Sequence, residues 1–293
     1  MLIRPELEAL RSDDTPQRLA QARLGAVLEG WQALPQTRAV QAELDRYAGG
    51  EPIDELPTLS ALFDPASGEG EAFVASVMAP MVAEQAREPL GQVALRHFTD
   101  DLIAASVLLR HGATTLTLAS VDGAALARKP VPLSVNFAPT ETIELILRGN
   151  AQGEMVRLDE ELPGGAARLS RSPFVLHPGM TTRRDGQREA QWLTAIQGSL
   201  ITLKLQRRPA MGGTAREYLL ADGSLVHQAA ACARDSRLEL VSSLLGRMGR
   251  RDAAPLLAAM AEEQGSPALR WQVLRECLAL DSAEGFRSLG LIA

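Results

Sequence analysis

The feature that most constrains the fold of this chain is a central run of short segments with β-strand character, from Gln92 to Ala231. Alternating or β-branched stretches such as Thr114 to Val121 and Thr142 to Leu147 end at turn residues, here Asp122-Gly123 and Gly149-Asn150. Strands of this length, about ten residues apart, are typical of an antiparallel sandwich or barrel and not of βαβ units. The centre of the sequence therefore predicts an antiparallel β domain.

The residues before Pro89 have helical periodicity instead. One helix is expected to start at Thr15-Pro16, because proline at the first helical position loses no needed hydrogen bond. A second is expected from Pro35 to Gly49-Gly50, and a third from Glu71 to Arg87. Residues 1–90 are therefore predicted to be an N-terminal helical segment, followed by the β domain over residues 91–234.

Helical periodicity returns at Asp235 and predicts four short helices in two antiparallel pairs, offset by about 30 residues. On the first helix, one face is expected to carry Leu238, Val241, Leu245 and Met248. Residues 235–293 thus resemble two HEAT-like repeats. The fold class expected is α+β: a β domain flanked by an N-terminal helical segment and a C-terminal HEAT-like tail.

Composition narrows the classes of partner. The net charge of −6 gives no general attraction to nucleic acid or to anionic lipid. The N-terminal residues lack the pattern of a signal peptide, and the longest apolar stretch, Phe73 to Ala83, is interrupted by Pro80. Cys232 and Cys277 are expected to be reduced thiols. We therefore expect a cytoplasmic protein that binds neither nucleic acid nor membrane.

The stretch from Gly179 to Gly198 has a glycine at each end and polar residues at several odd-numbered positions between them. Gly179 is followed after five residues by Asp185, then after one residue by Gln187, after three by Gln191, and after six by Gly198. Residues two apart on a strand point to the same face, so this spacing is typical of polar side chains that share one face of a strand pair.

This stretch resembles the first motif of the cupin superfamily, which has glycines at both ends and His, His and Glu at the three polar positions. The turn His177-Pro178-Gly179 and a partial second motif, Ala221-Asp222-Gly223 followed by His227, resemble the same family. The resemblance implies a cupin-like antiparallel β barrel, or jelly roll, with glycines turning the chain at each end of a hairpin.

The resemblance also places Asp185, Gln187 and Gln191 inside the barrel, with His227 as a fourth side chain. Where the family has imidazole and carboxylate ligands, this chain has one carboxylate, two amides and one imidazole, and neutral amides are poor ligands for transition metals. We therefore expect no cofactor. If a divalent metal does bind, its ligands would be these four residues.

A charged cluster surrounds the same stretch, with Arg183, Arg184, Asp185, Arg188 and Glu189 within seven residues. One interpretation is a barrel mouth whose arginines bind a small anionic ligand, since guanidinium binds carboxylate and phosphate in a bidentate manner. The other is a solvated, self-paired loop. The candidate ligand-binding residues are Arg183, Asp185, Gln187, Arg188, Gln191, Trp192 and His227.

Two functions remain open from the sequence. The first is a non-catalytic ligand-binding, regulatory or scaffold protein, whose helical tail contacts a protein partner or a second copy in a homodimer. The second, implied only by the cupin resemblance, is an isomerase, epimerase or dioxygenase with a non-standard metal site. The replaced ligand positions favour the first.

Overall fold

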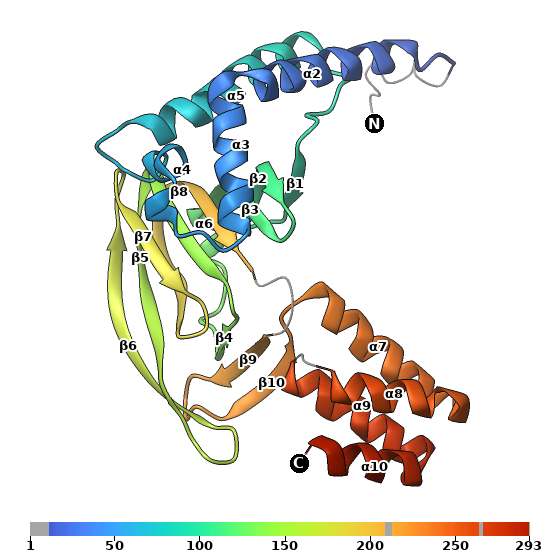
Figure 1. Cartoon of the computed structure of the whole chain (residues 1–293). Helices are drawn as coiled ribbons and strands as arrows, with labels where there is room; N and C mark the ends of the chain where they lie inside the picture. The colour runs from blue at the N-terminus through green and yellow to red at the C-terminus, as the bar shows by residue number, and fades with distance from the viewer. Residues whose placement is uncertain (1–11, 209–212, 264–265, 293) are drawn as a thin grey trace.

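The computed structural model describes residues 12–208, 213–263 and 266–292. Figure 1 shows N-terminal helices over one part of a β structure and a separate group of helices at the C-terminal end. The first residues of the chain, on which the prediction about a signal peptide rests, lie outside the described part. None of the described helices is long and apolar enough to cross a membrane.

The N-terminal helices agree with the sequence prediction. They are α2 (Thr15–Ala33), α3 (Pro35–Ala48) and α5 (Glu69–Arg87), with the short η1 (Ile53–Glu55) and α4 (Pro57–Ala61) between them. Proline occupies the first turn of α2, α3 and α4, where its missing N–H has no intrahelical acceptor to lose.

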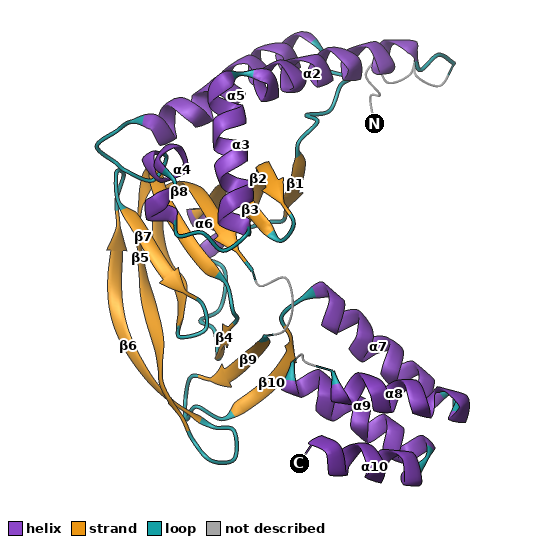
Figure 2. Ribbon diagram, viewed as in Figure 1, coloured by secondary structure: helices purple, strands orange, loops and turns teal. Residues whose placement is uncertain are grey.

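Two antiparallel sheets follow, coloured orange in Figure 2. The larger has the order β1-β2-β3-β8-β5-β6, with β7 also paired to β5, and the smaller has the order β10-β9-β4. No closed barrel forms among the described residues. The strands of the larger sheet are β1 (Arg96–Thr99), β2 (Ile103–His111), β3 (Thr114–Asp122), β5 (Glu141–Glu161), β6 (Ala167–Leu176), β7 (Thr181–Asp185) and β8 (Glu189–Arg207). Those of the smaller sheet are β4 (Ser134–Phe137), β9 (Thr214–Leu219) and β10 (Leu225–Ala230), and the short helix α6 (Gly123–Leu126) follows β3.

Two strands are longer than predicted. The sequence predicts a strand end at Gly149-Asn150 and a turn at Gly198, but β5 and β8 continue through both glycines. Gly149 and Gly198 have φ values of +91° and +73°, and the pairing of β5 with β8 shifts register in this region. These glycines therefore bend a paired strand instead of ending it.

The bend brings the two ends of β5 together. The Gly186 N–H donates to the Thr140 carbonyl at 2.8 Å, and the Leu158 N–H donates to the Arg188 carbonyl at 2.8 Å. Two residues of chain span at most about 7.6 Å, whereas a straight strand from Thr140 to Leu158 would extend about 60 Å. The long strands therefore fold back on themselves, and the two halves of the large sheet approach each other at this end.

The turn at His177-Pro178-Gly179 exists, but it does not begin a hairpin. β6 and β7 both pair with β5, one after the other and in the same direction. The Gly179 N–H donates to the Ile146 carbonyl, and the Ile146 N–H donates to the Met180 carbonyl, both at 2.9 Å. The turn thus separates β6 from β7, two successive strands that pair with β5 on either side of its bend.

Separate apolar cores hold these parts together. One is shared by the N-terminal helices and the larger sheet, where Trp31 and Phe73 lie with Leu116, Leu145 and Leu203. Another joins the C-terminal half of β5 to the smaller sheet. The N-terminal helices therefore share a core with the sheet.

The tail has the four predicted helices, α7 (Ala233–Arg247), α8 (Ala254–Glu262), α9 (Pro267–Leu280) and α10 (Ser282–Ile292), with the short η2 (Arg251–Ala253) before α8. α7 lies mainly against α9, while α8 lies against α9 and α10, so the first two helices do not form the predicted close pair. The predicted face of α7 is also divided: Leu238 and Leu245 join the core, and Val241 and Met248 are exposed. The HEAT-like character of the tail remains a prediction.

The bend can be tested with two matched glycine variants. A methyl group at Gly149 would lie 2.2 Å from the Ser199 carbonyl oxygen, whereas one at Gly198 meets no atom within 4 Å. Both residues have positive φ, so Gly198→Ala should cost about 1–2 kcal/mol of unfolding free energy. Gly149→Ala should cost about 2 kcal/mol more, measured by urea denaturation. Equal losses in the two variants would contradict this account of the bend.

Candidate functional site

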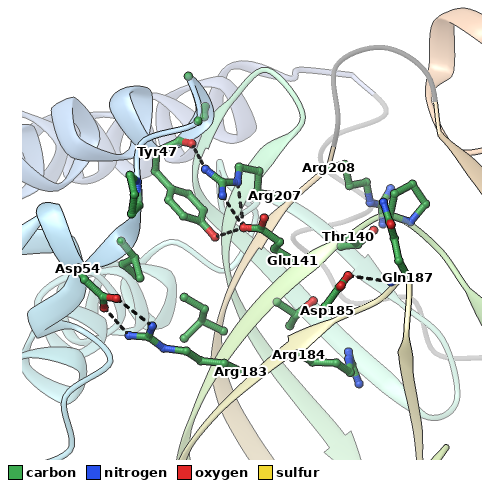
Figure 3. Close-up of a pocket in the computed structure, with 18 residues that line it drawn as sticks. Tyr47, Asp54, Thr140, Glu141, Arg183, Arg184, Asp185, Gln187, Arg207 and Arg208 are labelled. Carbon is green, nitrogen blue, oxygen red and sulfur yellow. Dashed lines mark hydrogen bonds and ion pairs between the residues drawn. The ribbon is translucent and has the colours of Figure 1, made fainter. Parts of the chain in front are cut away.

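A cleft with charged walls lies between the end of α3 and the larger sheet. It has a volume of about 790 Å³ and is lined by residues 47–54 on one side and by β5, β7 and the end of β8 on the other. Figure 3 shows four arginines in its walls: Arg183, Arg184, Arg207 and Arg208. Their partners decide which of them is available to a ligand.

Arg207 belongs to the framework of the cleft. Its guanidinium donates to Glu141 Oε2 and to the Tyr47 carbonyl, the latter at 2.7 Å, and lies 4.1 Å from the centre of the Tyr47 ring. The Tyr47 hydroxyl donates to Glu141 at 3.2 Å. Burial is the main reason that the pKa of Tyr47 rises to about 12, so the hydroxyl stays a donor at neutral pH. This cluster joins α3 to the first residue of β5.

Arg183 is also paired. Its Nη2 lies 2.9 Å from Asp54 Oδ1, and this guanidinium holds the pKa of the Asp54 carboxyl below its usual value. Figure 3 shows Arg183 turned toward Asp54 and its neighbour Arg184 turned the other way. The alternation is that of a strand, since successive side chains of β7 point to opposite faces.

The Arg184 side chain is half-buried and has no hydrogen bond or ion pair with any of the described residues. Burial lowers the pKa of its guanidinium, while Glu144 and Glu189 act in the opposite direction. Both carboxylates already have partners: Glu144 pairs with Lys204 at 3.3 Å and Glu189 with Arg157 at 3.1 Å. The Arg184 guanidinium, which remains charged, therefore keeps donors that the surrounding protein does not use.

Arg184 and Arg208 line a second cleft as well. This one has a volume of about 320 Å³ and lies beside β4, with Thr140, Thr142 and Gln206 in its walls. Arg208 is exposed, directly follows β8, and pairs with no carboxylate among the described residues. Two cations, two hydroxyls and an amide thus line adjoining clefts, an arrangement that suits recognition of an anion.

The residues predicted from the cupin resemblance are not brought together. Asp185 and Gln187 line the larger cleft and Gln191 and Trp192 the smaller one, while His227 is exposed on β10 in the other sheet. Asp185 ends β7 and Gln187 lies in the turn after it, and the described strands do not enclose these side chains in a closed barrel.

The chain turns at Gly186, and this turn explains why Asp185 and Gln187 do not lie along one face of a continuous strand. The Gly186 N–H donates to the Thr140 carbonyl and its carbonyl accepts from the Ala138 N–H, and the turn follows directly after β7 ends at Asp185. Gln187 therefore lies in the turn, where its N–H donates to Asp185 Oδ1 at 2.9 Å, and both residues are exposed. Arg188, in the same turn, is exposed and lines neither of the two clefts.

The donor set for a metal is accordingly poor. Within the described ranges, no group of three or more His, Cys, Asp or Glu side chains is placed to hold a metal ion. Asp185 and His227, the two conventional ligands of the predicted set, belong to different sheets. The residues present do not fit the metal site that the cupin resemblance implies.

The candidate residues expected from sequence do not include Arg184 or Arg208. Arg184 was visible only as one member of a charged cluster, and Arg208 as half of an Arg-Arg pair after a strand. Alternation along residues 181–185 would have separated Arg183 from Arg184. The partners Asp54 and Glu141, which engage Arg183 and Arg207, come from distant segments with no sequence signal of their own.

Comparison with known proteins identifies no family by sequence: no family model and no curated protein matches the chain. Among solved structures, the chain is similar to the DMSP lyase DddQ from Ruegeria pomeroyi DSS-3, at 15% identity and a TM-score of 0.30, covering 52% of this chain and 70% of that one. A cupin superfamily protein from Desulfitobacterium hafniense DCB-2 matches at 14% identity and a TM-score of 0.25, covering 38% and 83%.

Vicilin from Corylus avellana (hazelnut) matches at 11% identity and a TM-score of 0.27, covering 42% of this chain. The match spans about a third of the vicilin, 32% of its length. The structural neighbours thus include cupin-superfamily proteins. At TM-scores this low, the likeness identifies neither the function nor the site of this chain.

The cluster around Tyr47 predicts a pH dependence of stability. Its folded pKa of about 12 lies above the value of about 10 expected in the unfolded chain. The unfolded state therefore loses this proton first, and the free energy of unfolding should fall as pH rises from about 10 to about 12. Tyr47→Phe should remove this part of the fall, measured by urea denaturation at several pH values.

The other tyrosine of the chain provides the control. Tyr218→Phe should keep the Tyr47 contribution, and tyrosinate absorbance of that variant should titrate near pH 12. A Tyr47→Phe variant that loses as much stability as the wild type over the same pH range would contradict the assignment.

Proposed function

We propose that this chain is a non-catalytic binding protein that holds a small anionic ligand at Arg184 and Arg208. The observation that supports this most is the state of Arg184, a half-buried cation whose neighbouring carboxylates are paired with other residues. Arg183 and Arg207, in contrast, have carboxylate partners of their own. The proposed ligand-binding residues are therefore neighbours of those expected from sequence.

The energetics favour an incoming anion. Removing a cation from water without a bonded counter-ion costs free energy. Folding has already removed Arg184 from part of its water, so ligand binding adds less of this desolvation cost. A carboxylate or phosphate can accept two parallel hydrogen bonds from a guanidinium, and such charge-assisted bonds are about twice as strong as neutral ones. Arg184 is therefore preorganised for this interaction.

The rest of the two clefts indicates the size and polarity of the ligand. The Thr140 and Thr142 hydroxyls and the Gln206 amide would contact polar groups of a ligand held at Arg184. A volume of about 320 Å³, which shares lining residues with a cleft of about 790 Å³, suits a small organic acid or a phosphorylated metabolite. The class of ligand we propose is a small molecule with a carboxylate or phosphate group.

This proposal predicts stabilisation by anions. In thermal-shift and calorimetric titrations against inorganic phosphate, small dicarboxylic acids and sugar phosphates, at least one anion should bind the wild type. Arg184→Gln should weaken that binding about 10- to 100-fold, since a hydrogen bond to a charged group contributes about 1.5–3 kcal/mol. Arg208→Gln should weaken it less, because Arg208 is exposed.

Arg188→Gln is the matched control. It removes the same charge from the nearby turn but lies outside both clefts, so binding should change less than about twofold. The proposal would be refuted if no anion in the panel binds, or if Arg188→Gln weakens binding as much as Arg184→Gln does.

A second prediction concerns metal. Because Asp185 lies in an exposed turn and His227 in the other sheet, protein purified without chelator should contain far less than one transition metal per chain. Elemental analysis measures this directly. One tightly held metal per chain, lost in both Asp185→Ala and His227→Ala, would instead favour the cupin-type enzyme.

A further inference from the structure

The helical tail carries an apolar stripe that no described part of the chain covers. The stripe consists of Leu240, Val241 and Leu244 on α7 and Met248 at its C-cap, with exposed fractions of 71%, 52%, 56% and 59%. Single exposed apolar residues are common, but these four recur at helical spacing and form one continuous face. Figure 2 shows α7 at one edge of the tail.

The opposite face of α7 is already buried. Asp235 and Ser242 have no exposed surface, and Leu238 and Leu245 pack into the core that α8 and α9 share. The apolar stripe is therefore not the side by which α7 is attached to the tail. It is a second apolar face, left over after the tail has formed its core.

Two arginines flank the stripe. Arg237 lies one turn before Val241, and Arg247 lies one turn after Leu244, so both are next to the apolar side chains on the helix surface. Both are exposed, and neither has an ion pair within the described residues. The surface thus combines an apolar centre with positive charge at both ends.

From this surface we infer that α7 binds an acidic amphipathic helix of a partner protein. Such a helix would lay its apolar face on the stripe and its Asp or Glu side chains beside Arg237 and Arg247, a helix-to-helix mode of recognition. Met248 adds a flexible apolar contact that adapts to the partner surface. The charges of the partner would set its orientation and specificity.

A second copy of this chain fits the stripe less well. In an antiparallel pair that places Leu240 on Leu244 of the other copy, Arg237 lies opposite Arg247. In a parallel pair, Arg237 lies opposite its own equivalent. Either arrangement brings like charges together, which disfavours self-association through this face.

An anionic membrane surface is also disfavoured. The stripe occupies four positions of a helix whose other side is packed against α9, whereas membrane-surface helices are free to present a broad apolar face. The net charge of −6 adds a long-range repulsion from anionic lipid. An acidic helix with a complementary apolar face matches both the shape and the charge of the stripe.

The test uses the full chain and two designed helical peptides. Both carry leucines at helical spacing along one face, flanked by Glu in one peptide and by Lys in the other. The Glu peptide should bind the wild type at least tenfold more tightly than the Lys peptide, measured by fluorescence anisotropy. Leu244→Ser should weaken binding of the Glu peptide about tenfold or more. The double variant Arg237→Glu/Arg247→Glu should reverse the preference in favour of the Lys peptide.

The control is Leu133→Ser, which removes a leucine just before β4 that is 81% exposed, against 56% for Leu244, and should leave binding unchanged. Circular dichroism establishes that the variants keep their helix content. The inference is overturned if the Glu peptide does not bind, if Leu244→Ser and Leu133→Ser behave alike, or if the charge reversal has no effect. It is also overturned if the wild type, but not Leu244→Ser, dimerises in light scattering or binds phosphatidylserine vesicles.

Discussion

The rest of the structure depends on the bend of two long paired strands. Gly149 and Gly198 adopt positive φ without leaving the β5–β8 ladder, so the strands change direction while their backbone groups stay paired. A small apolar core of Ile146, Leu200 and their neighbours lies at the bend. Because the strands fold back, both ends of β5 lie at the turn after β7. Thr140 and Thr142, at the start of β5, line both clefts.

The electrostatics of the site follow from strand alternation. Neighbours on β7 have opposite roles: Arg183 fixes the sheet to the η1 segment through Asp54, and Arg184 points toward the interior between carboxylates that already have partners. At the end of β8, Arg207 fixes α3 to β5, and Arg208 faces the clefts. In each pair, one arginine stabilises the fold, and we propose that the other serves the ligand.

The sequence predicted the class of each element better than its length or its partners. Helices with proline in their first turn and strands with strict alternation were predictable because those signals are local. The turn at Gly198 was predicted wrongly, since a glycine that ends a strand and one that bends it look alike in sequence. The ion pairs of Arg183 with Asp54 and of Arg207 with Glu141 were not predictable, because tertiary contacts bring these carboxylates to the arginines. Val241 and Met248 were expected on the same buried face as Leu238 and Leu245 but are exposed. Which face of α7 is buried depends on its tertiary contacts with α9, and the sequence of the helix does not contain them.

The central claim is that Arg184 and Arg208 hold an anion, and the most direct test is to locate one. A crystal structure grown with selenate, a tetrahedral dianion whose selenium is identified by anomalous scattering, would show its position without assumptions about the natural ligand. We expect a selenium peak at about 4 Å from the donor nitrogens of the Arg184 guanidinium, because the selenate oxygens that accept its hydrogen bonds lie between them. Selenate bound at other arginines while Arg184 has no anion beside it would contradict the account.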